Sequence, residues 1–273
     1  MTTAERTTPK RIVLPPSTGE QKRNQLDASN PILLLSPAII LIVWELMAQL
    51  GFIDVRFFPA PSTVAQTFWE EILSGAWFYH VGMTLMRVLV GFTVGAFTGI
   101  LVGVVMGLSS FVRVAIYPLI AAIYPVPKVA IFPLVLLILG LGEASKITTV
   151  IASCFFFLAM STMSGVLNIP NVYKDVGKNF GAGRAAFITT IALPAALPAI
   201  FSGLRLALGA AFLVDVSIEF VSAQEGIGWL IWHSWELFSL PLMFVGLLTV
   251  SFLGLLLTFS LDFIEEKLVP WRT

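Results

Sequence analysis

Six long apolar runs, separated by short polar segments, dominate the pattern of hydrophobic and polar positions. About 20 consecutive apolar residues are enough for an α-helix to cross the hydrocarbon core of a membrane. Each run therefore predicts a membrane-spanning helix. The runs cover residues 32–50, 82–108, 112–141, 146–168, 194–222 and 240–264.

The third run is interrupted by prolines, which remove a backbone hydrogen bond from a helix interior. Cut near Lys128, it would leave two pieces too short to span a bilayer alone. We therefore interpret residues 112–141 as one broken helix, which is tolerated where other protein or a cavity satisfies the freed backbone groups. The prolines are Pro118, Pro125, Pro127 and Pro133.

Composition and charge agree with a polytopic membrane protein. The 273 residues are 57% hydrophobic and 12% charged, against about 25% charged residues in soluble proteins. The predicted inner segments hold eleven Lys and Arg, whereas the outer loops hold only Arg56 and Lys146. This bias places both termini in the cytoplasm. Residues 1–30 are expected to be a disordered basic tail, 31–268 the six-span domain and 269–273 a cytoplasmic end.

Two outer loops have patterns of their own. Apolar residues at helical spacing within residues 51–80 predict an interfacial helix, whose start Thr63 and Gln66 would stabilise as a capping box. In the second loop Trp229, Trp232 and Trp235 recur every third residue. They are most simply anchors at the membrane surface.

Charged residues inside the spans are expensive and each needs a partner or a water-filled path. By depth, Arg87 and Glu219 could meet as a buried ion pair that fixes the helix register. Alternatively, these charges line a translocation path. The candidates for that path are Arg87, Lys128, Asp215 and Glu219, and Glu45 is a further intramembrane charge.

The second span carries a glycine at every fourth position. Such a stripe lets another helix backbone approach closely in a membrane. The neighbouring helix could belong to this chain or to a second copy. The predicted packing residues are Gly91, Gly95, Gly99, Gly103 and Gly107.

Recognisable catalytic and metal-binding motifs are missing from the sequence, which contains no P-loop, H-E-x-x-H, C-x-x-C or G-x-S-x-G pattern. His80 and His233 lack a plausible ligand set, and no predicted strand precedes the glycine pair at Gly181 and Gly183 as a dinucleotide site requires. We expect a protein that is not an enzyme, with no metal and no cofactor, driven by a gradient or a partner.

The predicted cytoplasmic loop between the fourth and fifth spans contains two short helices. The first, from about 171 to 180, would end at Gly181, since glycine commonly ends helices. The second would run from about 184 to Pro194. Tyr173, Val176 and Phe180 form an apolar face that needs a cover, so this segment indicates a docking site for a soluble partner.

The same loop resembles that of the membrane subunits of bacterial ATP-binding-cassette (ABC) importers. Their signature is E-A-A, three residues, G, nine residues, then I-x-L-P. The corresponding residues here are Asp175-Val176-Gly177, Gly181 and Ile191-Ala192-Leu193-Pro194. The spacing matches throughout, whereas the opening triplet departs from the signature. Segments 198–207 and 226–228 are similar to the nitrate/sulfonate/bicarbonate branch.

The resemblance implies an all-α type I importer permease with six transmembrane helices in the bacterial inner membrane. Its partners would be ABC ATPase subunits that bind ATP and Mg, a second permease subunit and an extracytoplasmic solute-binding protein, with no nucleic acid. The solute would be a small anion such as nitrate, a sulfonate or bicarbonate, or a vitamin-like heterocycle. The implied docking residues in the coupling loop, about 171–192, are Tyr173, Asp175, Val176, Gly177, Phe180, Gly181, Ala182 and Gly183. An ion-coupled secondary transporter that uses Lys128, Asp215 and Glu219 is the alternative.

Overall fold

The computed structural model describes residues 31–270, and this part of the chain is helical with no strand. The predicted tail, residues 1–30, and residues 271–273 lie outside the described residues. The elements are α1 (Pro31–Gln49), α2 (Pro61–Ser74), α3 (Ala76–Leu108), α4 (Ser110–Ile123), α5 (Lys128–Leu139), α6 (Glu143–Leu167), α7 (Asn171–Asn179), α8 (Arg184–Phe187), the π-helix η1 (Ile188–Ala192), α9 (Leu193–Ser222), α10 (Ile227–Glu236) and α11 (Leu240–Leu268).

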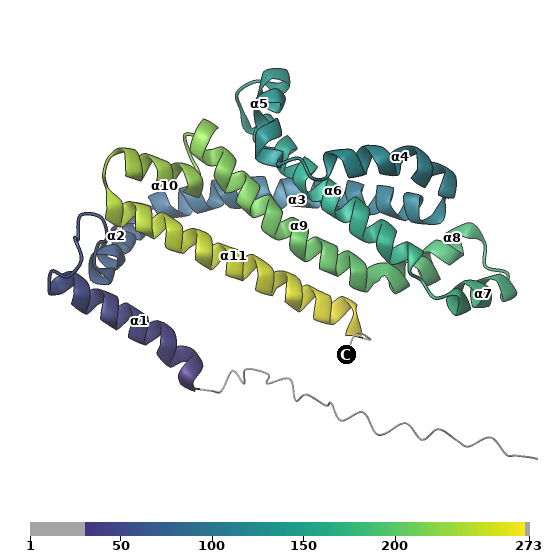
Figure 1. The fold of residues 1–273 in the computed structure, drawn as a ribbon, viewed down its shortest axis with the longest axis horizontal. Helices are drawn as coiled ribbons and strands as arrows, with labels where there is room; N and C mark the ends of the chain where they lie inside the picture. Colours follow the sequence, from purple (N-terminus) through teal and green to yellow (C-terminus); the bar gives the residue numbers. More distant parts are fainter. Residues whose placement is uncertain (1–30, 271–273) are drawn as a thin grey trace, which may run out of the picture.

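The described residues form an elongated bundle built on the long helices α3, α6, α9 and α11 (Figure 1). The short helices α2 and α10 lie at one end of the bundle, and α7 and α8 lie at the other. The apolar core between the long helices includes Val88, Cys154, Leu158, Ala207 and Leu253. The two ends are therefore joined by continuous helices, so that a displacement at one end can reach the other.

Four helical segments are long and apolar enough to cross a membrane: α3, α6, the run Arg184–Ser222 and α11. The pair α4 and α5 passes the same test only together, and its halves are bent by 100°. The broken helix expected over 112–141 is thus an elbow. The sixth expected span, α1, has 19 residues, which is about 28 Å of helix. Its described apolar part is Leu35–Gln49, so six spans remain a prediction.

The outer segment 51–80 differs from the expectation in two respects. The helix α3 already starts at Ala76 and not at residue 82, directly after Gly75, whose φ of 80° ends α2. The predicted capping box is wrong, because Ala60 is the N-cap and makes no side-chain cap. Instead, Glu45 of α1 accepts hydrogen bonds from Ser62 N at 2.9 Å and Ser62 Oγ at 2.7 Å. A carboxylate from another helix thus stabilises the positive end of α2.

The glycine stripe of α3 packs against α6 of the same chain. A Cβ atom added at Gly95 would lie 2.6 Å from Ile151 O, and one at Gly99 would lie 2.8 Å from Phe155 O. Equally close approaches occur at Gly91, Gly103 and Gly107. The neighbour that the sequence left open is therefore α6, and the two backbones meet at distances that only glycine allows.

We expect Gly95→Ala to destabilise the bundle, because the added methyl meets a backbone carbonyl that cannot rotate away. Overpacking of this kind costs about 1–3 kcal/mol. The matched control is Gly82→Ala on the same helix, where nothing lies within 4 Å of the added atom. There the change should stabilise slightly, since alanine is the better helix former. Thermal melting of the purified variants in detergent measures both. Equal melting temperatures would show that α3 and α6 can separate freely.

Candidate functional site

The loop between α6 and α9 projects as a helical knob at the end of the bundle. Phe180 follows α7, and Gly181 takes φ of 67°. Gly181 N donates to Lys178 O at 3.0 Å, and Ala182 N donates to Gly177 O at 2.9 Å. This pair of bonds is a Schellman ending, so the helix stops where the sequence predicts it to stop.

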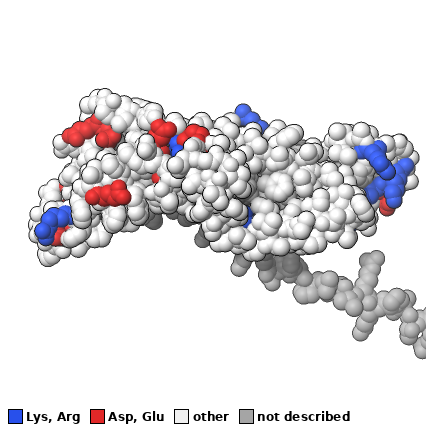
Figure 2. Space-filling model, turned by 90° about the horizontal axis from the view of Figure 1, so that it is seen from above, with Lys and Arg blue, Asp and Glu red and all other residues white. Residues whose placement is uncertain are grey.

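The knob presents an apolar surface that is surrounded by basic residues. Tyr173, Val176 and Phe180 are exposed to 55%, 45% and 87%. Figure 2 shows Lys and Arg gathered at this end of the molecule, while Asp and Glu dominate the end that carries α2 and α10. Exposed apolar side chains on a rigid helix favour contact with another protein. The other predicted docking residues lie here too, with Asp175 and Gly183 exposed and Ala182 half-buried.

Gly177 connects the knob to the bundle. It is buried, and a Cβ atom there would lie 2.8 Å from Ile191 Cδ1 and 3.2 Å from Phe187 Cδ2. Because α7 packs this closely on η1, glycine is favoured at the third position of the triplet Asp175-Val176-Gly177. The π-helix η1 runs directly into α9. It was not predicted, although Pro194, which lacks an N–H, is the kind of residue that disturbs the preceding turn.

Lys128 lies at the elbow between α4 and α5. Its ammonium donates to three backbone carbonyls, those of Ile123 and Tyr124 at 3.0 Å and that of Val126 at 2.7 Å. The nitrogen also lies 4.8 Å from the centre of the Phe156 ring. Lys128 thus binds carbonyls around the break between α4 and α5, where the prolines remove helical N–H donors, as a bent helix inside a membrane requires.

A second site lies near the end of the bundle opposite the knob, around a fully buried guanidinium. Arg87 Nη1 lies 2.6 Å from Glu219 Oε1, and Arg87 Nη2 lies 2.8 Å from Glu143 Oε1. Lys146 Nζ donates to the same Glu143 carboxylate at 2.8 Å. Glu225 Oε1 lies 3.5 Å from Arg87 Nη2 at the rim. We call Arg87, Glu143, Lys146, Glu219 and Glu225 the arginine cluster. The cluster contains the ion pair between Arg87 and Glu219 that was predicted from their similar depth in the membrane.

The cluster also holds the start of α10. Three successive backbone N–H groups each find a side-chain acceptor: Gly226 N donates to His80 Nδ1 at 3.1 Å, Ile227 N to Thr84 Oγ1 at 2.9 Å and Gly228 N to Glu219 Oε2 at 2.7 Å. A Cβ atom at Gly226 would fall within 2.6 Å of three atoms of the Glu219 carboxyl group. The glycines allow this carboxylate to reach the positive end of the helix.

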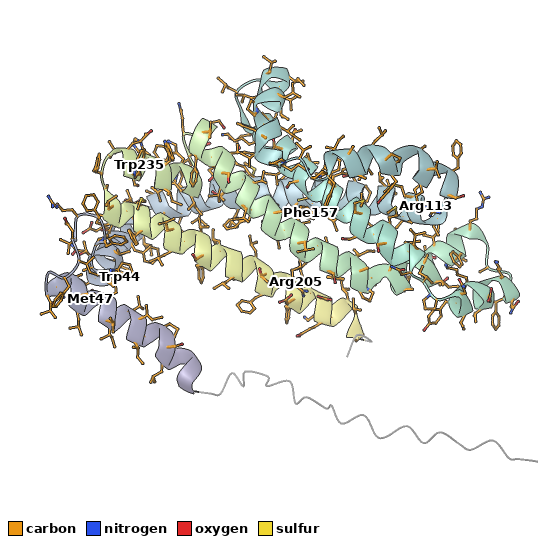
Figure 3. The ribbon with its side chains drawn as sticks, in the orientation of Figure 1. Trp44, Met47, Arg113, Phe157, Arg205 and Trp235 are labelled. Atoms are coloured by element: carbon orange, nitrogen blue, oxygen red, sulfur yellow. The ribbon has the colours of Figure 1, made fainter. Side chains whose placement is uncertain are left out.

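Sequence reasoning missed several members of this site. Lys146 was predicted to lie in an outer loop, but it lies with Glu143 in the first turn of α6, where Lys146 is 6% exposed. Their spacing of three residues at the edge of an apolar run was the available signal. His80 and His233 both stack on Trp229, with ring centres at 5.2 and 4.6 Å. Trp232 and Trp235 are exposed, and Trp235 lies at the same end of the bundle (Figure 3).

A further group of ion pairs joins α9 to α11. Arg205 of α9 points toward α11 (Figure 3), where it donates to Asp262 and to Glu265, the latter at 2.7 Å. The described residues contain no group of three or more His, Cys, Asp or Glu that could hold a metal ion. Asp215 is buried one turn before Glu219 and has no hydrogen-bond partner.

Comparison with known proteins decides the family. Residues 91–272 match the model of the binding-protein-dependent transport system inner membrane component. The chain belongs to this family. Its members are transporter permease subunits and not enzymes. The match covers the coupling loop, Glu143, Glu219 and the start of α10, whereas Arg87 lies just before it.

Three similar proteins agree with this membership. The putative aliphatic sulfonates transport permease protein SsuC of Bacillus subtilis is 31% identical and aligns over 88% of this chain and 87% of its own. The taurine transport system permease protein TauC of Escherichia coli is 30% identical, over 86% and 87%. A chain of the MetNI methionine ABC transporter, solved in inward-facing conformations, has a TM-score of 0.60 at 18% identity and covers 72% of this chain and 95% of that chain. The fold is that of a type I ABC importer permease.

In this family member, exchanging the two charges Arg87→Glu and Glu219→Arg should fail to restore the assembly lost in either single variant. Breaking a buried pair costs about 3–5 kcal/mol, and the exchange places the new carboxylate at position 87 beside Glu143. Adding Glu143→Gln should recover part of the loss. The yield and melting temperature of protein extracted in detergent measure this. Full recovery in the double variant would mean that Glu143 contributes little.

Proposed function

We propose that this chain is the permease subunit of an ABC importer and passes a small solute inward while a partner ATPase hydrolyses ATP. The exposed apolar knob on α7 carries the proposal. It ends in the Schellman turn at Gly181, and its spacing to Ile191-Ala192-Leu193-Pro194 matches the importer signature. An exposed apolar surface on a rigid helix fits a protein partner.

The packing of the chain supports a mechanical role for the knob. A partner that grips Tyr173, Val176 and Phe180 would move α7. Gly177 seats α7 on Phe187 and Ile191, so the motion passes into η1 and α9. The 30-residue helix α9 then ends at the arginine cluster. A partner can shift such an equilibrium only if it prefers one conformation of the knob. In this proposal ATP and Mg bind to the ATPase subunit.

We infer that the cations inside the spans hold the helices and do not line the solute path. Arg87 is fully buried, Lys128 is 8% exposed, and both are surrounded by acceptors of the same chain. Arg205 is neutralised by two carboxylates. A second permease subunit would complete the path, and an external binding protein would select the solute. The names of the relatives favour a small sulfonate or a similar anion as that solute.

We expect Gly181→Val to abolish co-purification of the ATPase subunit while membrane insertion is retained. A β-branched residue is strained at φ of 67°, so the Schellman ending and the position of Phe180 are lost. The matched control is Gly183→Val, at φ of −66° with nothing within 4 Å of the added atom. This variant should keep its partner. Mild-detergent extraction of tagged protein, followed by identification of the co-purifying chains, measures both.

Two results would contradict the proposal. Equal ATPase recovery with both variants would remove the knob from docking. A wild-type chain that is purified alone and still moves solute into liposomes without ATP would favour the secondary transporter. In that case, uptake should collapse when a protonophore dissipates the proton gradient.

The charge distribution also predicts the orientation. If both termini face the cytoplasm, a tag at Thr273 should resist protease in intact spheroplasts and be cut after lysis. A tag in the loop at Arg56 should be cut in both preparations and serves as the control. Cleavage at Thr273 in intact spheroplasts would overturn the orientation and the number of spans together.

A further inference from the structure

Asp215 is the exception among the buried carboxylates of the bundle. Its residue exposure is 0%, and neither carboxylate oxygen has a hydrogen-bond partner. By contrast, Glu219, one helical turn further along α9, has contacts to Arg87, Thr84 and Gly228 N. Buried polar groups normally have partners, so Asp215 requires an explanation.

Charged groups face Asp215 from its own helix and from its neighbours. Glu219, Arg87, Glu143 and Lys146 lie close enough to interact with it electrostatically. Titratable groups on the other packed elements have partners of their own. His80 accepts from Gly226 N, Lys128 donates to backbone carbonyls, and Glu225 lies at the rim beside Arg87. On α11, Asp262 and Glu265 pair with Arg205.

The carboxylates of this region already outnumber its cations when Asp215 is neutral. Arg87 and Lys146 are ion-paired with Glu143 and Glu219, and Glu225 adds a third carboxylate beside Arg87. An ionised Asp215 would add a further anion, fully buried and without a hydrogen bond. An isolated charge in a low-dielectric interior is far less favourable than its neutral form. A bound metal ion does not fit, because the described residues hold no group of ligands for one.

We propose that Asp215 is a proton-binding site and is held as a neutral carboxylic acid in the folded bundle. The proton is taken from water when the carboxyl becomes buried and is released to water when the bundle opens. This inference is independent of the transport function, because it rests on burial, missing partners and the charge balance. It also separates Asp215 from Glu219, which has to be ionised to bind Arg87.

The first test compares Asp215→Asn with Glu219→Gln, two neutral substitutions one turn apart, in the full chain with its co-purifying subunits. Asp215→Asn should melt at or above the wild-type temperature. Glu219→Gln should melt about 10 °C lower, because it removes the buried carboxylate that pairs with Arg87. If the melting temperature of Asp215→Asn falls as far as that of Glu219→Gln, the negative charge of Asp215 is needed, and the proposal is overturned.

Infrared difference spectroscopy tests the protonation state without relying on stability. The wild-type protein at neutral pH should show the carbonyl stretch of a protonated carboxylic acid, and Asp215→Asn should lack it. Glu219→Gln should retain the band. A spectrum of the wild type without a protonated carboxyl, or one in which Asp215→Asn keeps the band, would overturn the proposal.

Discussion

Arg87 is a guanidinium with no exposure to solvent, and the arrangement of four helical elements depends on how its charge is satisfied. Its nitrogens reach Glu219 on α9, Glu143 on α6 and the backbone of Glu225 before α10. Inside a membrane such a cation is tolerated only with partners of opposite charge. The requirement is geometric, because a planar fork of donors accepts few arrangements of carboxylates. Satisfying it fixes the depth of α3 against α6 and α9 and brings the start of α10 onto Glu219.

The glycine stripe and the arginine cluster fix the same helix pair by different physical means. Along α3, backbone contact with α6 supplies dispersion energy but tolerates sliding by one turn, since glycines recur at every fourth position. The pair Arg87–Glu143 removes that freedom, because a slide of one turn would separate two buried charges. Packing thus supplies the affinity between the helices, and the ion pair selects one register. The position of α9, held at one end by Glu219 and at the other by the seat of α7, follows from both.

Local rules with a single dominant cause were readable from the sequence. Gly181 ends α7 because a left-handed position favours glycine, and Arg87 meets Glu219 because both are charges at equal depth in apolar spans. The features that were missed depend on groups brought together by the fold. Glu45 stabilises the start of α2 across 17 residues, which no local pattern announces, so a capping box at Thr63 appeared sufficient. The 100° elbow depends on Lys128 supplying three hydrogen bonds to freed carbonyls, whereas the prolines alone indicate only a break.

The use of cations inside the bundle constrains how the solute can be recognised. Arg87, Lys128, Lys146 and Arg205 each have acceptors of the same chain, and the first three are at most 8% exposed. A cation that is already neutralised by carboxylates or carbonyls attracts a further anion only weakly. If it broke these bonds to bind the solute, the helix register described above would be lost. If the solute is an anion, as proposed above, selectivity for it has to come from weaker groups on the path, such as hydroxyls and backbone N–H donors, or from an external protein that binds the solute first. Weak binding along the path is also what rapid release requires, because a site that holds the solute tightly would retain it. The bundle thus keeps its strong charges for its own packing.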